Sequence, residues 1–212
     1  MINALGKIFA RLVASHVQLH RSATCPDCGS QLARAVDDAN AAWSCPNPDC
    51  PPQVLKRVEL WASLEAMDIQ GCNAALVKQL VQRGLVRDAA EFYRLKIAEL
   101  ASLEGFDLTK ARALWEAIQA SKQREAWRVL FGLGIPNLGV PEAQALCKHC
   151  AALEDAFALG RERLAKLDGV TETVARSLTH WSGDPVNRKL VRRLAKAGIN
   201  FDTRSTQTKS VN

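Results

Sequence analysis

The sequence predicts a mainly helical protein in which a small four-cysteine zinc knuckle is followed by a four-repeat helix-hairpin-helix bundle. Two observations predict this fold class. Two pairs of cysteines lie close together within residues 25–50. Apolar residues then recur at helical spacing through residues 54–200, with short glycine-centred breaks. Sustained alternation of apolar and polar residues is missing from residue 54 onward, which argues against strands there.

The composition is typical of a globular protein rather than of a disordered or membrane-spanning one. The chain has 212 residues, 48% of them hydrophobic and 24% charged, which is enough to bury a core and argues against disorder. No run approaches 18 uninterrupted apolar residues, so we expect no membrane span and no membrane partner. Four of the seven cysteines have metal-ligand spacing, so we expect a reducing, cytoplasmic compartment rather than a disulfide framework.

Positive charge gathers at the two ends of the chain, whose formal net charge is +6. Residues 1–24 hold three basic residues and no acid, and residues 185–212 hold seven basic residues and one acid. Both ends are candidates for contact with a polyanion. The alternative, which charge alone favours, is a solvated helix face and a frayed tail.

The first 24 residues form an apolar-basic segment with helical spacing. It lacks a basic cluster ahead of its apolar stretch, so we do not predict a secretory signal. The segment could also be the remnant of a domain that precedes the cysteines.

Residues 25–53 are expected to form a zinc module. The ligand set is Cys25 and Cys28, then a sixteen-residue spacer, then Cys45 and Cys50. Four thiolates complete a tetrahedral Zn²⁺ shell and leave no position for water, so one structural ion would supply the folding free energy that so small a module lacks. Gly29 would let the turn bring backbone amides toward the sulfurs. An iron–sulfur site or unrelated free thiols are the alternatives.

Three further cysteines lie in the helical part, at Cys72, Cys147 and Cys150. The run Cys147-Lys148-His149-Cys150 contains metal-binding residue types. Adjacent residues on one helix point in different directions, so we do not expect a second metal site there. We expect these cysteines to be small buried side chains.

Four segments of the helical part share an apolar residue, a tight turn and a following helix. Their turns align at residues 71, 105, 137 and 169, with spacings of 34, 32 and 32 residues. Six residues after each aligned position comes a small or medium apolar residue, which we expect where two helices approach closely: Val77, Ala111, Ala143 and Ala175. Tetratricopeptide repeats have a similar period, but their tryptophan-containing pattern is missing and these turns are too rich in glycine.

A helix-hairpin-helix turn directs backbone amides at the start of a helix toward an anion, and phosphate suits them. The turn needs glycine, both for positive φ and for close backbone approach. Four such units would grip double-stranded DNA by its backbone, largely independent of sequence. Gly71, Gly105 and Gly169 are the candidate contacts in the first, second and fourth hairpins.

The third hairpin is the strongest candidate for DNA contact. It alone keeps a second glycine and has a proline in the first helical turn. Its candidate contacts are Asn137, Leu138, Gly139 and Val140. The other hairpins replace Gly139 by Asn73, Asp107 and Thr171. Asn and Asp tolerate a left-handed conformation and Thr tolerates it poorly, so helix packing is the alternative role of these three hairpins.

Basic residues near the turns could assist binding. Lys110 and Arg112 follow the second hairpin, and Arg176 follows the fourth. Solvated helix residues are the alternative for each. Residues 186–198 predict an amphipathic helix with a basic outer face. Residues 201–212 are expected to be a disordered tail.

The ordered set of motifs resembles the C-terminal half of bacterial NAD-dependent DNA ligases, its zinc finger plus helix-hairpin-helix domain. The segments that carry the resemblance are CPDCGS, SCPNPDCPPQ, EAMDIQG, FYRL, LEGF, SK and LFGLGIPNLG. The resemblance covers about residues 25–202, and residues 6–13 look like the end of the oligonucleotide-binding barrel that precedes the zinc module in that family. It implies a helix-hairpin-helix domain over 54–200, nicked duplex DNA as partner and association with the nucleoid.

The resemblance also bears on catalysis. The family's nucleophilic lysine lies in a K-x-D-G motif of an adenylation domain that binds NAD. Lys166-Leu167-Asp168-Gly169 has these letters but lies inside the fourth hairpin, in the family's order for that repeat. We therefore expect neither a catalytic residue nor NAD binding in this chain. Leu60 and Leu64 stand where the family usually has His and Arg, a departure that bears on DNA affinity.

Three functions are compatible with these motifs. The first is a non-catalytic DNA-binding module that serves nick sealing in replication and repair. The second is the DNA-binding half of a split ligase, with a separate adenylation chain as partner. The third is a scaffold that has kept the fold and lost DNA affinity. Salt-dependent binding to nicked duplex DNA separates the first from the third.

Overall fold

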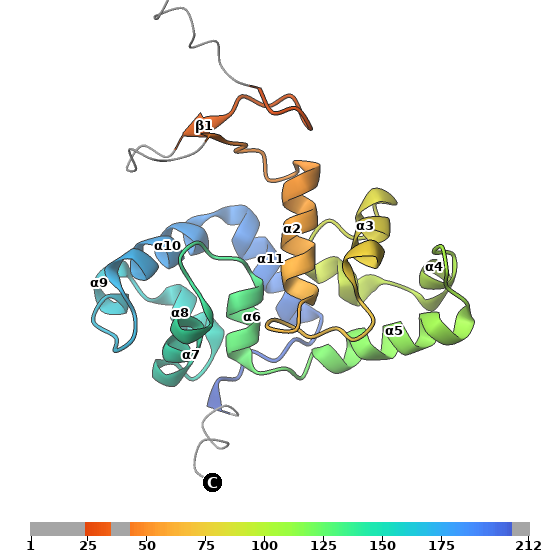
Figure 1. The fold of residues 1–212 in the computed structure, drawn as a ribbon. Helices are drawn as coiled ribbons and strands as arrows, with labels where there is room; N and C mark the ends of the chain where they lie inside the picture. Colours follow the sequence, from red (N-terminus) through yellow and green to blue (C-terminus); the bar gives the residue numbers. More distant parts are fainter. Residues whose placement is uncertain (1–23, 35–42, 205–212) are drawn as a thin grey trace, which may run out of the picture. The chain divides into compact units, whose positions relative to one another are not determined.

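The computed structural model describes residues 24–34 and 43–204 (Figure 1). The chain divides into two compact units, Met1–Pro52 and Gln53–Asn212. This division lies one residue from the expected boundary between the zinc module and the helical part. The expected remnant of a preceding domain over residues 1–24 lies, apart from Thr24, outside the described residues.

The described part of the first unit holds two short strands. Strand β1 (Ala33–Arg34) pairs antiparallel with β2 (Trp43–Ser44), so that Ala33 lies opposite Ser44. An isolated antiparallel bridge joins Thr24 to Gln31. These pairings hold together the segments that carry the first and second cysteine pairs.

The second unit is helical. Its elements in chain order are α2 (Pro51–Ala62), α3 (Ala74–Gln82), the 3₁₀ helix η1 (Ala89–Arg94), α4 (Ile97–Ala101), α5 (Leu108–Ser121), α6 (Ala126–Gly132), α7 (Val140–His149), α8 (Leu153–Ala158), α9 (Arg161–Leu164), α10 (Glu172–Gly183) and α11 (Pro185–Lys196). Helix α2 begins immediately after Cys50, three residues before the predicted start of the helical part. Helix α11 matches the predicted amphipathic helix: Leu194 is buried, and Asp184 caps its first turn ahead of Pro185.

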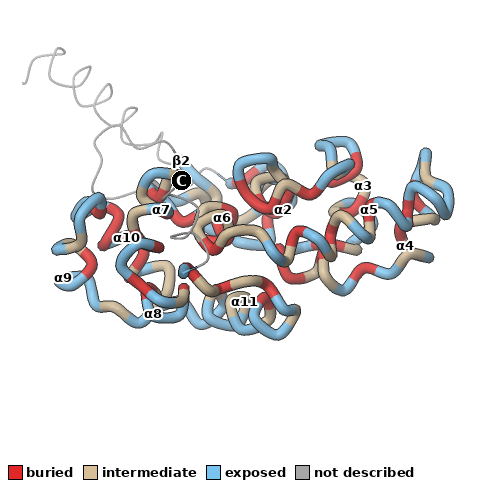
Figure 2. Tube along the Cα trace, turned by 90° about the horizontal axis from the view of Figure 1, so that it is seen from below, coloured by how far each residue is buried: buried red, intermediate tan, exposed pale blue. Residues whose placement is uncertain are grey.

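One apolar core runs through the helical unit, on the inner sides of its helices (Figure 2). The residues six positions after each aligned turn are all buried: Val77 is 1% exposed, and Ala111, Ala143 and Ala175 are 0% exposed. All four therefore lie in the core, which agrees with the sequence prediction that they lie between packed helices.

Each of the four turns contains one left-handed residue, and it lies at the aligned position. The φ angles are 81° at Gly71, 78° at Gly105, 63° at Asn137 and 76° at Gly169. The third repeat therefore uses Asn, which tolerates this conformation, where the others use Gly. The predicted four-hairpin register is confirmed at the level of single backbone angles.

The position two residues after each aligned residue is not left-handed, so the expectation that Gly139 and its equivalents need this conformation was wrong. Asn73, Asp107, Gly139 and Thr171 all have negative φ and extended backbones, and each is the N-cap of the helix that follows. None of them needs a left-handed conformation. Asn, Asp and Thr occur there because their side chains accept hydrogen bonds from the first turn of the helix.

The expected disordered tail over 201–212 is wrong at its start. Phe201 is 8% exposed and Thr203 is 0% exposed. The Leu153 amide donates to the Phe201 carbonyl at 3.0 Å, and the Thr203 amide donates to the Ala151 carbonyl at 3.1 Å. The backbone of this segment gains these bonds because it pairs with the loop between α7 and α8. Residues 205–212 lie outside the described residues.

Within residues 24–34 and 43–204, no helix has the length and apolar character needed to cross a membrane.

Candidate metal centre and nucleic-acid interface

Four cysteines of the first unit lie together in one cluster. The sulfur atoms of Cys25, Cys28, Cys45 and Cys50 all lie within 4.8 Å of one another. Cys25 Sγ lies 3.7 Å from Cys50 Sγ, and Cys28 Sγ lies 3.4 Å from Cys45 Sγ. A tetrahedral zinc site with Zn–S bonds of about 2.3 Å has sulfurs about 3.8 Å apart. The cluster is therefore positioned to bind one metal ion as a structural zinc with a closed shell.

Local turns place these sulfurs. The Gly29 amide donates to the Cys25 carbonyl at 2.9 Å, and the Cys25 amide donates to the Ser30 carbonyl at 2.8 Å. Gly29 has a φ of 72°, so the glycine allows the left-handed residue that closes this knuckle. In the second pair, the Cys50 amide donates to the Asn47 carbonyl at 3.1 Å.

The electrostatics of the cluster favour a cation. Burial, followed by the neighbouring thiols, raises the pKa of Cys50 to about 12, and burial also raises the pKa of Cys45. Hydrogen bonds from the side chain and amide of Ser30 lower the pKa of Cys28 to about 6. Four thiolates this close repel one another, so the ionised set needs a positive ion among them.

The other three cysteines do not form a second metal site in the described part of the chain. Cys147 is 2% exposed and Cys150 is 8% exposed. Burial raises the pKa of Cys72 and of Cys147 to about 12, so both are neutral thiols near neutral pH. Cys147 and Cys150 are the small buried side chains that the sequence predicted, whereas Cys72 is only partly buried against the core.

In the helices that follow the hairpin turns, the amides of the first helical turn donate hydrogen bonds to different acceptors. Asn73 Oδ1 accepts from the Leu76 amide at 2.9 Å, and Asp107 Oδ1 accepts from the Lys110 amide at 2.8 Å. In the fourth hairpin, Thr171 Oγ1 accepts from the Val174 amide at 3.3 Å. These three helix starts already hold an oxygen acceptor of their own.

The third hairpin differs because glycine has no side chain. The N-cap of α7 therefore supplies no side-chain acceptor to the amides of the first helical turn, unlike the N-caps of the other three hairpins. The Glu142 carboxylate turns back and accepts from the Gly139 amide at 3.0 Å. The turn 136–139 carries no charged residue. The Gly139 amide is thus held by a carboxylate, and the Leu138 amide donates to the Ile135 carbonyl at 3.2 Å. An anion at this turn would have to displace Glu142 from the Gly139 amide.

The backbone angle of Gly139 does not require glycine, and a side chain there would only have to displace the end of Glu142. Its φ is −87°, which any residue can adopt. A Cβ atom built there would lie 2.9 Å from Glu142 Oε2. The predicted need for positive φ therefore applies to Asn137 and not to Gly139.

The third and fourth hairpins lie against each other. Asn137 Nδ2 donates to Ser177 Oγ on α10 at 3.0 Å, and His149 Nε2 lies 3.1 Å from the Asp168 carbonyl. A Cβ atom at Gly169 would lie 2.7 Å from the Ala145 Cβ on α7, so only glycine allows this approach. Gly169 therefore has a packing role between the two hairpins. Ser177 and Glu142 were missed from the sequence, although a Glu three residues after a helix cap is the pattern of a capping box.

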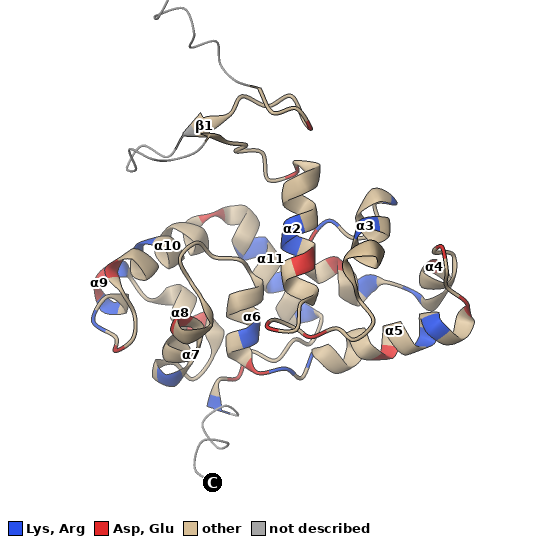
Figure 3. Ribbon diagram, in the orientation of Figure 1, with Lys and Arg blue, Asp and Glu red and all other residues tan. Residues whose placement is uncertain are grey.

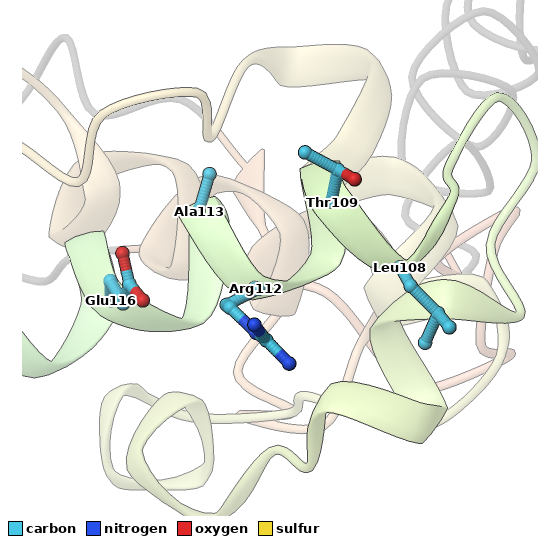
Figure 4. A pocket seen from close by; sticks show the side chains of 5 residues that line it. All are labelled: Leu108, Thr109, Arg112, Ala113 and Glu116. Carbon is cyan, nitrogen blue, oxygen red and sulfur yellow. The ribbon is translucent and has the colours of Figure 1, made fainter.

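The candidate basic residues are placed differently from one another. Lys110 Nζ donates to the Gly105 carbonyl at 2.9 Å, so its ammonium closes its own turn. Arg112 is exposed and lines a shallow hollow along α5 with Leu108, as Figure 4 shows. Arg176 is exposed on α10. In the described part of the chain, no ion pair engages Arg112 or Arg176.

The K-x-D-G letters fall in the turn between α9 and α10. Lys166 is exposed there, and Gly169 supplies the left-handed residue of the fourth hairpin. A lysine nucleophile must be desolvated so that its amine is neutral. Lys166 has the geometry of a hairpin turn residue.

Comparison with known proteins agrees with this geometry. The pattern of the NAD-dependent DNA ligase C4 zinc finger domain matches residues 24–51, and the pattern of the helix-hairpin-helix motif matches residues 128–191. The chain resembles the zinc finger and helix-hairpin-helix region of NAD-dependent DNA ligases. The second match spans the third and fourth hairpins.

Several curated DNA ligases are similar over most of this chain. The DNA ligase of Rubrobacter xylanophilus is 41% identical over 177 residues, which are 84% of this chain and 26% of that protein. The DNA ligase of Synechococcus sp. strain JA-3-3Ab is 40% identical over 82% of this chain and 26% of its own length. The DNA ligase of Aquifex aeolicus is 38% identical over 84% of this chain and 24% of its own length. The chain thus spans about a quarter of the length of these relatives.

Proposed function

We propose that this chain is a non-catalytic DNA-binding module that holds duplex DNA by its phosphate backbone during nick sealing. The observation that carries the proposal is the start of α7, where Gly139 supplies no capping side chain and only the Glu142 carboxylate, which a phosphate would displace, accepts from the Gly139 amide. Backbone amides at a helix N-terminus bind an anion without reading bases. The similarity to DNA ligases supports a phosphate of a DNA strand as that anion.

In this proposal the hairpins have different roles, some in binding DNA and some in helix packing. The third hairpin is the principal phosphate contact, through the amides of Gly139 and Val140 once a phosphate displaces Glu142. Leu138 supports the turn, since it is buried and its amide donates to the Ile135 carbonyl. The fourth supports it by packing, since Gly169 allows the close approach of Ala145. The second is a weaker contact than the third. Both hairpins have a carboxylate at the helix start, but Asp107 is itself the N-cap and holds the Lys110 amide, whereas Glu142 reaches back from the third helical position.

The zinc cluster has a structural part in this proposal. When bound, the ion holds the two cysteine knuckles together, and Cys25, Cys28, Cys45 and Cys50 would hold it. All four positions of the shell are filled by protein sulfur, so the ion has no open position for a substrate. The proposal gives Lys166 no part in adenylation, because its side chain is exposed in a hairpin turn and a nucleophilic lysine must be desolvated.

The test places a capping side chain where α7 has none. The substitution Gly139→Asn copies the cap that Asn73 supplies in the first hairpin, and the φ of −87° at Gly139 accepts it. We expect duplex affinity to fall by about tenfold, since one phosphate contact is lost, while thermal stability is kept. Fluorescence anisotropy with a labelled nicked duplex measures the affinity.

A matched control exists at Gly160, the N-cap of α9. Gly160 has a φ of −75°, and a Cβ atom there would have no neighbour within 4 Å. Gly160→Asn makes the same chemical change at a helix start outside the hairpin turns, and duplex affinity should stay the same. Equal affinities for Gly139→Asn and the unsubstituted chain would remove the third hairpin from the interface.

A further inference from the structure

A hollow between α8, α10 and α11 is not used by the proposed backbone grip. Its volume is about 250 Å³, and its apolar lining comes from Phe157, Ala158, Trp181 and Val191. The Phe157 and Trp181 rings lie 5.8 Å apart at 33°. Drug-sized ligands need pockets of about 300 Å³ or more, so this hollow suits a single flat ring better than a larger molecule.

Two arginines edge the hollow on the α11 side. Arg188 and Arg192 both line it, and both are exposed. They are four residues apart on one helix, so they lie on the same face about 6 Å apart along its axis. Within residues 24–34 and 43–204, no ion pair occupies either guanidinium. The basic residues of α11 are drawn in Figure 3.

The acidic and basic residues of the lining lie on different helices, so the charge differs between the two sides of the hollow. Glu154 on α8 is the acid of the lining, and the two arginines lie on α11. An occupant that carries a negative charge is therefore drawn to the α11 side, with its apolar part against the rings. A nucleotide has this build, since its base stacks on aromatic side chains and its phosphate pairs with arginine.

The hollow is close to the third hairpin along α10. Ser177, which accepts from Asn137 of that hairpin, lies one helical turn before Trp181. One turn advances about 6 Å along the helix axis. A strand whose phosphate is held at the third hairpin can thus reach the hollow within a few nucleotides.

We propose that this hollow binds an unpaired nucleotide of a DNA strand, with the base against Phe157 and Trp181 and the phosphates on Arg188 and Arg192. The inference rests on the proposed function, because it takes the strand to be one that leaves a duplex held by the hairpins. It adds a preference for DNA with unpaired nucleotides over fully paired duplex. A peptide with an apolar and an acidic side chain is the competing occupant.

The test compares duplexes with and without a short thymidine overhang, using the full zinc-loaded chain. We expect the overhang to raise affinity at least about fivefold, the lower end of what one stacked base contributes. An abasic overhang, which keeps the phosphates and lacks the bases, should give no such gain. An abasic overhang that binds as well as thymidine would overturn the proposal.

Matched variants on α11 distinguish binding in the hollow from a general effect of positive charge on DNA affinity. Arg188→Gln with Arg192→Gln should abolish the gain from the overhang and leave binding to the blunt duplex within about twofold. Lys189→Gln with Lys196→Gln removes the same charge from exposed positions that do not line the hollow. This control pair should keep the gain from the overhang, and its loss there would contradict the proposal.

The remaining outcomes distinguish the two proposals. If the blunt duplex binds and the overhang adds nothing, the hollow proposal fails and the proposed function stands. If the blunt duplex does not bind in dilute salt, the proposed function fails, and binding of free oligothymidylate that depends on Arg188 and Arg192 still supports the hollow. Competition by an acidic, tryptophan-containing peptide, without any gain from the overhang, would assign the hollow to a protein partner and overturn the proposal.

Discussion

Gly169 meets two demands at a single residue. Its φ is 76°, and a Cβ atom there would lie 2.7 Å from the Ala145 Cβ. Gly105 meets only the first demand, with a φ of 78° and nothing within 4 Å of a Cβ. Comparing substitutions at the two glycines therefore distinguishes the free energy lost through a strained backbone angle from the free energy lost through a steric clash.

We expect Gly105→Ala to lower the free energy of unfolding by about 1–2 kcal/mol, the cost of a left-handed residue with a Cβ. Gly169→Ala should cost about 1–3 kcal/mol more, because the methyl group also meets Ala145. Urea denaturation measures both. Adding Ala145→Gly should recover the extra loss in Gly169→Ala, and equal losses in the two single variants would contradict the close approach.

Two asparagines of the hairpins have roles that residue type alone does not distinguish. Asn, Asp and Gly favour both left-handed turns and helix N-caps, so residue type alone did not say which role Asn73 or Asn137 has. The structure gives Asn137 the left-handed angle and Asn73 the cap. Spacing could have decided this, since the aligned position lies two residues before the cap in every repeat.

At the scale of elements, we expect a bound ion to stabilise the zinc module more than its small core does. Its described strands are two residues long. Cys45→Ser removes one of the four ligands, so we expect residues 25–50 to unfold and zinc to be lost. The helical unit should keep its far-ultraviolet circular dichroism. Retention of one zinc per chain in this variant would show that the ligand assignment is wrong.

The zinc affinity of the same module should fall as the pH falls. Burial and neighbouring thiols raise the pKa of Cys50 to about 12 in the metal-free cluster, so this thiol is protonated at neutral pH and the ion must displace its proton. Acid favours the protonated, metal-free form. A chromogenic chelator should therefore capture zinc faster at mildly acidic than at neutral pH, and a rate independent of pH would contradict a thiolate shell.

The C-terminal segment acts as an element that closes the fourth repeat. Phe201 is 8% exposed and belongs to the core of the helical unit. Phe201→Ala should lower the free energy of unfolding by about 3–5 kcal/mol, the usual cost of an aromatic core truncation. Arg204→Ala is the control, because its ion pair with Asp202 is exposed and such pairs contribute little. Thermal unfolding compares them, and similar midpoints for both variants would argue against this closure.

The composition of that segment explains why its start was expected to be disordered. Residues 203–212 read Thr-Arg-Ser-Thr-Gln-Thr-Lys-Ser-Val-Asn, a polar sequence typical of frayed ends. Its ordered part depends on distant partners, since the amides and carbonyls it pairs with belong to residues 150–153. Long-range pairing of this kind leaves no periodic signal in a local sequence window.

At the scale of the whole molecule, local patterns with strong physical causes were predictable. The cysteine spacing predicted the metal cluster, and the repeat of turn plus small apolar residue predicted the four hairpins. The pairing of the third and fourth hairpins was not predictable, because it depends on Asn137 reaching Ser177, forty residues away. The hollow between α8, α10 and α11 depends on packing in the same way.

The central claim is that hairpin amides hold the DNA backbone whatever its sequence. A salt titration of binding to two nicked duplexes of unrelated sequence, each compared with its intact form, tests this claim most directly. We predict that both nicked duplexes bind equally in dilute salt and that log affinity falls with log salt along the same line for both. The absence of binding in dilute salt, or binding to one sequence only, would contradict the account.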